Sequence, residues 1–258
     1  MNIREKRTYS GKSFEPEFYP VRVDGRKYSR GTKKELSRAA QKNYNDKVAR
    51  RYLRRLLDTN FNENDYYCTF TYRDSELPTT YAEVKKDINN FFKRVRRARK
   101  KAELKEELKY IYAIEYKVSR KTGKARLHLH LVINGGLSRQ EVKRLWGKGD
   151  IKRVEELQPD EHGFQQLAIY LCKEWTNELL PENRKRYTPS RNLKKPKTPP
   201  PKDGVFSARY LEKLCKERID DAGFWERRYK GYRFIEAEAT YDEDWGIWHL
   251  SVFMRKRD

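Results

Sequence analysis

Two neighbouring segments with a two-residue alternation constrain the fold of this 258-residue chain most strongly. In residues 109–118 and 125–134, large apolar side chains occupy every second position, as in strands that bury one face. The intervening "SRKTGK" (119–124) contains Gly123, which suits the positive φ of a tight turn. We therefore predict an antiparallel hairpin.

A four-residue loop would pair Ser119 with Lys124 and so set the register of this hairpin. Counting back pairs the apolar residues with one another: Tyr116 with Leu127, Ile114 with Leu129 and Tyr112 with Leu131. Because the two apolar faces coincide, the pattern supports this register without any functional assumption.

The same register places Glu115 opposite His128, and the small Ala113 opposite His130. Cross-strand partners share a face with Cβ atoms about 5 Å apart, so two imidazoles and one carboxylate converge. Such a three-ligand site with open positions can hold a divalent cation that polarises a phosphate oxygen or activates water. The alternative is a solvated sheet face on which the three groups pair by hydrogen bonds, and the sequence leaves both open.

Residues 163–179 have helical periodicity, and Tyr170 falls on the polar face, opposite the apolar stripe. A phenol is a competent nucleophile when positive charge near the phosphate stabilises the phenolate. Lys173, one turn further, can supply such charge. A surface tyrosine beside a lysine is an equally ordinary arrangement in a chain with 18 tyrosines.

The remaining periodicity predicts further strands at 65–72 and 150–157 and helices at 32–58, within 77–101 and at 138–146. A helix at 207–221, ended by Gly223, and a hairpin at 232–240 and 245–255 follow. This order predicts an α+β fold with a central, mainly antiparallel sheet flanked by helices.

Four regions are expected along the chain. Residues 1–60 comprise an extended arm (1–31) and a basic helix, and residues 61–195 form the core with the candidate site. A proline-rich linker spans 196–204. Residues 205–258 are either part of the same domain or a small lobe. The first helix is expected to bury one stripe: Leu36, Ala39, Ala40, Tyr44, Val48, Tyr52 and Leu56.

The charge balance favours a polyanionic partner. Sixty Lys and Arg residues against 38 Asp and Glu leave a net charge of +22, which attracts nucleic acid. The basic clusters are either solvated helix faces or phosphate-binding groups. The residues expected to contact DNA are Arg50, Arg51, Arg54, Arg55, Lys93, Arg94, Arg96, Arg97, Lys194 and Lys195.

Several protein classes are disfavoured. The three cysteines form no C-x-x-C pair, which argues against a disulfide framework or a cysteine zinc site. No signal peptide and no apolar run of about 18 residues is visible, so we expect a cytoplasmic protein without membrane contact. The phosphate-binding loop of ATP-driven motors is also missing from the sequence.

Three motifs resemble those of a known family. "CTFTY" (68–72), "HLHLV" (128–132) and "YLCK" (170–173) follow the order found in HUH-type rolling-circle replication initiators. The flanking "LWGKGDIKRVEEL" and "RYTPSRNLKKPK" resemble versions from small circular phages and bacterial mobile elements. The similarity spans about residues 60–200.

The resemblance implies an HUH-endonuclease-like fold and a metal-dependent single-strand DNA endonuclease and ligase. Such an enzyme nicks a replication origin through a 5′-phosphotyrosine intermediate. Tyr170 would be the nucleophile with Lys173 as its assistant, and the ligands of Mg²⁺ or Mn²⁺ would be His128, His130 and Glu115. Its partners would be single-stranded or origin DNA and a separate helicase and polymerase from a bacterial host. A relaxase or single-tyrosine transposase would share this chemistry, whereas a non-catalytic nucleic-acid-binding protein is the alternative from another class.

Overall fold

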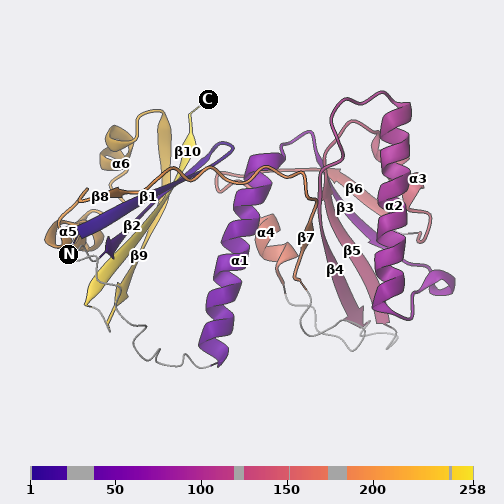
Figure 1. The fold of residues 1–258 in the computed structure, drawn as a ribbon, viewed down its shortest axis with the longest axis horizontal. Helices are drawn as coiled ribbons and strands as arrows, with labels where there is room; N and C mark the ends of the chain where they lie inside the picture. Colours follow the sequence, from indigo (N-terminus) through magenta and orange to yellow (C-terminus); the bar gives the residue numbers. More distant parts are fainter. Residues whose placement is uncertain are drawn as a thin grey trace. The chain divides into compact units, whose positions relative to one another are not determined.

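The computed structural model describes residues 2–21, 38–118, 125–150, 152–173, 185–243 and 246–257. They divide into two compact units, each built on one five-stranded antiparallel sheet (Figure 1). Unit 1 comprises residues 1–59, 160–165 and 195–258, and unit 2 comprises residues 60–159 and 166–194. The predicted α+β class is confirmed.

The sheet of unit 2 has the strand order β6-β3-β5-β4-β7. Its strands are β3 (Tyr66–Thr71), β4 (Tyr110–Val118), β5 (Ala125–Ile133), β6 (Lys152–Glu156) and β7 (Thr188–Pro189). The predicted register of β4 and β5 is confirmed: Ile114 pairs with Leu129, and Glu115 pairs with His128. The predicted turn at 119–124 lies outside the described residues.

One face of this sheet is covered by α2 (Tyr81–Lys101) and α3 (Arg139–Trp146) (Figure 1). A capping box between Thr80 and Glu83 starts α2, and basic residues 99–101 lie at its C-terminal end, where the helix dipole favours them. Trp146 is fully buried against Phe70, and its Nε1 donates to the Thr71 carbonyl at 2.7 Å. The core residues Phe70, Ile114 and Leu129 point to this face. The opposite face carries Glu115, His128 and His130, together with the buried Ile111 and Val132.

Helix α4 (Gln165–Leu171) follows β6, and all of it except Gln165 belongs to unit 2. Ala168 and Leu171 are buried, whereas Tyr170 is 38% exposed. The helix was expected to continue to residue 179, but residues 174–184 lie outside the described part of the chain. The 3-10 turn Asp74–Glu76 links β3 to α2.

The sheet of unit 1 has the order β8-β1-β2-β10-β9. Its strands are β1 (Asn2–Ser10), β2 (Ser13–Val21), β8 (Lys202–Asp203), β9 (Tyr232–Asp242) and β10 (Ile247–Lys256). Helices α1 (Arg38–Asn60), α5 (Ala208–Glu217) and α6 (Ala222–Arg228) complete the unit. Phe14, Phe18 and Trp225 lie at the centre of its core.

The prediction of an extended arm at 1–31 is wrong for residues 2–21, which form the β1–β2 hairpin. The alternation was hidden because charged residues take buried positions: Glu5 and Glu15 are 1% and 2% exposed. Arg7 and the Tyr229 hydroxyl donate to Glu5 and so compensate its burial. The C-terminal hairpin joins this sheet through β10 and β2, and part of the expected linker forms β8 beside β1.

Two helix predictions also need correction. The predicted buried stripe of α1 is wrong at three positions: Tyr44, Val48 and Tyr52 are 62%, 49% and 42% exposed. Leu53 and Leu57 are buried instead. Tyrosine is found both buried and exposed, so the spacing of tyrosines is a poor guide to the buried face of a helix. The predicted start at Thr32 lies outside the described residues.

The predicted helix at 207–221 is two helices. α5 ends at Glu217, and the Asp221 side chain accepts a hydrogen bond from the Phe224 amide at 2.8 Å, which caps α6. Gly223 therefore lies inside the second helix and does not end the first.

Asp58, near the end of α1, is a buried carboxylate of unit 1. Its oxygens accept hydrogen bonds from the Ser13 hydroxyl at 2.7 Å and the Phe164 amide at 3.0 Å. Close by, Gly11 has a φ of 57°, and a Cβ there would lie 1.9 Å from the Asp58 carbonyl oxygen. Burial raises the pKa of Asp58 from 3.8 to about 6, although these hydrogen bonds oppose the shift.

We predict that Asp58 makes the stability of unit 1 fall as pH rises from 3.8 to about 6. Below both pKa values the proton is bound in both states; between them only the folded state retains it, so this stabilisation is lost as pH increases. Asp58→Asn mimics the protonated form and removes this component, which is about 3 kcal/mol. Urea unfolding across this pH range would measure it, and parallel profiles for the two proteins would contradict it.

Candidate functional site

The candidate site lies on the polar face of the unit 2 sheet. Glu115 comes from β4, and His128 and His130 come from β5. Since Glu115 pairs with His128, and His130 is two residues further along β5, all three side chains point to one face. The hairpin register alone is therefore enough to assemble these groups.

One carboxylate oxygen of Glu115 lies close to His130 and faces His128 at a longer distance. Oε2 of Glu115 lies 2.6 Å from Nε2 of His130 and 3.7 Å from Nδ1 of His128. Glu115 and His130 are 3% and 2% exposed, whereas the His128 side chain is 23% exposed. The cluster is thus accessible to solvent on the His128 side.

These three residues fit a divalent cation. One ligand atom from each lies within 4.8 Å of the others. Two ligands of one ion, each about 2.1 Å from it, are about 3 to 4 Å apart, so little movement would be required. A carboxylate this deeply buried also needs positive charge nearby, which a cation or a protonated imidazole supplies.

Tyr67 and Thr69 of β3 contact the other nitrogen of His130. The Tyr67 hydroxyl lies 2.7 Å from Nδ1, and the Thr69 hydroxyl lies 3.4 Å from it. In the neutral tautomer that satisfies both short contacts, Nε2–H donates to Glu115 and Nδ1 accepts from Tyr67. If Nε2 binds a cation, Nδ1 must carry the proton, and the Tyr67 oxygen can then accept it. The hydroxyl therefore suits both states.

Sequence reasoning did not identify Tyr67 as part of the site. The alternation of residues 65–72 puts Tyr67 and Thr69 on one face of their strand, but it does not reveal which strand pairs with β3. The structure pairs Thr69 with His130 across β3 and β5. To place Tyr67 at the site, the sequence would have had to reveal that β3 is the neighbour of β5 in the sheet.

Tyr170 reaches the same cluster from α4. Its hydroxyl lies 3.3 Å from Nε2 of His130, and the two rings meet edge to face at 4.9 Å. Burial raises the pKa of the Tyr170 phenol, and the negative charge of Glu115 adds to the effect. The polar face of α4 thus faces the site while Ala168 and Leu171 are buried elsewhere.

Lys173 follows Tyr170 by three residues, just beyond the end of α4. Its amide donates to the Tyr170 carbonyl at 3.2 Å, so the helical path continues to this residue. Its side chain is exposed.

The predicted DNA contacts on α1 are mostly engaged within unit 1. Arg54 and Arg55 both pair with Glu15, at 2.5 and 2.9 Å, and Arg51 pairs with Glu17 at 2.6 Å. Arg50 is exposed. Three of the four predicted arginines thus balance the carboxylates of Glu15 and Glu17 on β2.

The predicted contacts in unit 2 are more accessible. Arg94 donates to the carbonyls of Leu145 and Trp146 at 2.8 and 3.0 Å, and so joins α2 to α3. The other predicted basic residues of unit 2 are exposed: Lys93, Arg96, Arg97 and Lys194. Lys195, which belongs to unit 1, is also exposed.

Residues 65–178 match the sequence model of a family of replication-associated proteins. This segment is less than half of the chain, yet it contains Tyr67, Glu115, His128, His130 and Tyr170. The match supports a replication-initiator family and a role in replication initiation. Neither the curated proteins nor the solved structures gave a match. Among the described residues, no helix combines the length and apolarity needed to cross a membrane.

We predict that Tyr67→Phe weakens Mn²⁺ binding about 10- to 100-fold, because Nδ1 of His130 loses its closest partner and the ring is less firmly oriented. Tyr66→Phe is the matched control, since Tyr66 lies next to it in β3 but packs against the core on the opposite face. Isothermal titration calorimetry would measure both affinities. Equal affinities in the two variants would refute a positioning role for Tyr67.

Proposed function

We propose that the protein is a metal-dependent DNA endonuclease that nicks one strand at a replication origin and starts rolling-circle replication. The observation that carries the proposal is the Tyr170 hydroxyl, 3.3 Å from Nε2 of His130 within the Glu-His-His cluster. A potential nucleophile and potential metal ligands thus meet at one point. The replication-associated family match supports DNA as the substrate.

Glu115, His128 and His130 would hold the cation, for which Mg²⁺ or Mn²⁺ is preferred because phosphoryl transfer usually uses hard ions. When bound, it would withdraw negative charge from the phosphate oxygens. The residues themselves would fix its position, and Tyr67 would orient His130 from the other side of the ring. His128, the most exposed of the three ligands, would lie on the side from which DNA approaches.

Tyr170 would attack the phosphorus atom, so that one P–O bond forms to the phenol and the P–O3′ bond breaks. The phenol loses a proton and the leaving 3′ oxygen gains one, so the step is balanced. The product is a 5′-phosphotyrosine and a free 3′-hydroxyl, which can prime synthesis. Since the phosphotyrosine keeps the energy of the broken bond, attack by a 3′-hydroxyl would rejoin the strand without ATP.

Tyr170 is a better nucleophile candidate than Tyr67. The Tyr67 hydroxyl lies on the Nδ1 side of His130, whereas Tyr170 lies on the Nε2 side together with Glu115. Nε2 is also the nitrogen that lies 2.6 Å from the Glu115 carboxylate. The raised pKa of Tyr170 means that its phenolate would depend on positive charge at the site, which the cation and Lys173 would supply.

The proposal places the protein beside a helicase and a polymerase from the host, which would unwind and extend the nicked strand. A relaxase or a single-tyrosine transposase would perform the same bond exchange on another DNA. The replication-associated family match favours the initiator.

We predict that Tyr170→Phe abolishes the covalent protein–DNA adduct, because no oxygen remains to form the bond. Tyr187→Phe, which removes a hydroxyl from a part-buried tyrosine of the same unit, should leave the adduct unchanged. The measurement is denaturing electrophoresis of labelled single-stranded origin DNA after incubation with Mn²⁺. Chelation with EDTA, or the double change His128→Ala and His130→Ala, should slow nicking at least about 100-fold.

The outcomes separate the classes of function. An adduct in Tyr170→Phe would identify another nucleophile. Tight binding of DNA without nicking in the wild type, with metal present, would instead indicate a non-catalytic DNA-binding protein.

A further inference from the structure

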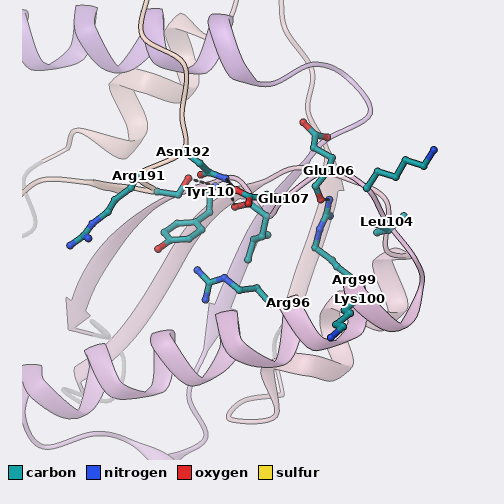
Figure 2. Close-up of a pocket in the computed structure, with 12 residues that line it drawn as sticks. Arg96, Arg99, Lys100, Leu104, Glu106, Glu107, Tyr110, Arg191 and Asn192 are labelled. Carbon is teal, nitrogen blue, oxygen red and sulfur yellow. Dashed lines mark hydrogen bonds between the residues drawn. The ribbon is translucent and has the colours of Figure 1, made fainter.

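A second feature of unit 2 is a pocket of about 580 Å³ at the C-terminal end of α2 (Figure 2). Its walls come from α2, the 104–108 segment, the first residue of β4 and residues 190–192. All of these belong to unit 2. None of them belongs to the Glu-His-His cluster.

Four cationic side chains line this pocket: Arg96, Lys100, Lys105 and Arg191. All four are exposed, and within the described part of the chain their side chains make no hydrogen bond or ion pair. In Figure 2, Arg96 extends from α2 toward Tyr110, whereas Arg191 extends from the 190–192 segment away from the other labelled residues. Their charge is therefore available to an anion.

A fifth cation, Arg99, is 5% exposed and forms part of the pocket lining. Its guanidinium donates to the carbonyl oxygens of Asn134, Gly135 and Glu106 at 3.3, 2.5 and 2.9 Å. Carbonyl oxygens are neutral, so these bonds fix the side chain without cancelling its charge. Its buried Nε has no hydrogen-bond partner among the described residues.

Two carboxylates of the lining oppose this charge only in part. The Glu106 carboxylate pairs with the Lys109 ammonium group at 2.5 Å, and this pair balances the negative charge of Glu106. The Glu107 carboxylate accepts a hydrogen bond from the side-chain Nδ2 of Asn192 at 3.2 Å. Five cations against these two carboxylates leave the lining with a surplus of three positive charges.

The pocket is fixed in shape by hydrogen bonds between its walls. The Tyr110 amide donates to the Ser190 hydroxyl at 3.1 Å, and the Ser190 amide donates to the Tyr110 carbonyl at 2.8 Å. Asn192 also donates to the Leu108 carbonyl at 3.2 Å. Residues 190–192 are thus held against the start of β4, so little ordering is needed when a ligand binds.

We propose that this pocket binds the phosphodiester backbone of a single DNA strand, with a sugar or base against Leu104, Leu108 and Tyr110. The mixture of free cations and apolar or aromatic surface suits a nucleotide unit better than an isolated inorganic anion. A continuous strand is favoured over a free nucleotide because exposed Lys93 and Arg97 continue the positive surface of α2 beyond the pocket.

A DNA-binding pocket would extend the proposed function, and only the choice of DNA as its ligand rests on that function. Tyr110 and Glu115 are five residues apart on β4, about 17 Å, and their side chains point to opposite faces. The strand would therefore be gripped at a distance from the cleaved bond, near the β4–β7 edge of the sheet. This contact would hold the DNA without taking part in the chemistry.

The test compares a double variant, Arg96→Ser with Arg191→Ser, with a control double variant, Lys86→Ser with Arg144→Ser. Both remove two exposed positive charges from unit 2, but the control residues do not line the pocket. Fluorescence anisotropy of an oligothymidylate of about 16 nucleotides, with EDTA, reports binding. All proteins carry Tyr170→Phe, so a lack of nicking activity cannot affect the result.

Removing two phosphate contacts should reduce the slope of log affinity against log salt by about 1.4 for a single strand. Between about 50 and 200 mM salt, the parent should lose about 7-fold more affinity than the pocket variant, and the control should behave like the parent. Equal slopes for the pocket variant and the control would overturn the proposal. A second outcome would also overturn the proposal. If thymidine monophosphate competed as well as the oligonucleotide at equal nucleotide concentration, the pocket would be a site for free nucleotides.

Discussion

The pairing of β4 with β5 is the interaction on which the candidate site depends. Because side chains alternate along a strand, a slip of one residue would turn Glu115 into the core and bring Ile114 or Tyr116 to the polar face. The apolar partners Ile114 and Leu129, buried under α2, prevent that slip. The packing of one face of the sheet therefore determines the geometry of the chemical groups on the other.

His130 links the strands of the hairpin to the rest of unit 2. Its Nε2 meets Glu115 and the Tyr170 hydroxyl, and its Nδ1 meets Tyr67. One imidazole thus joins β3, β4 and α4 around a single buried point. The two ring nitrogens therefore have different neighbours, with Tyr67 beside Nδ1 and Glu115 and Tyr170 beside Nε2.

The sequence was sufficient for the hairpin, because its apolar residues are all of types that strongly prefer burial. It was insufficient for Tyr67, because alternation within a strand does not reveal the neighbouring strand. It failed for β1 and β2, because the buried Glu5 and Glu15 look like surface residues until Arg7 and Arg55 are placed beside them. Glu15 and Arg55 are 40 residues apart, and a pair so distant in the sequence leaves no local pattern.

The sheet of unit 2 has the hydrophobic core on one face and the candidate site on the other. Glu115 and His130 lie outside the cluster of Phe70, Leu129 and Trp146 that holds the unit together. Burial of a carboxylate costs free energy of desolvation, so the face with the candidate site depends on the apolar face for its stability and does not add to it. Such a scaffold can accept other residues on its polar face while keeping its architecture, because the packing that holds the hairpin in register lies on the opposite face.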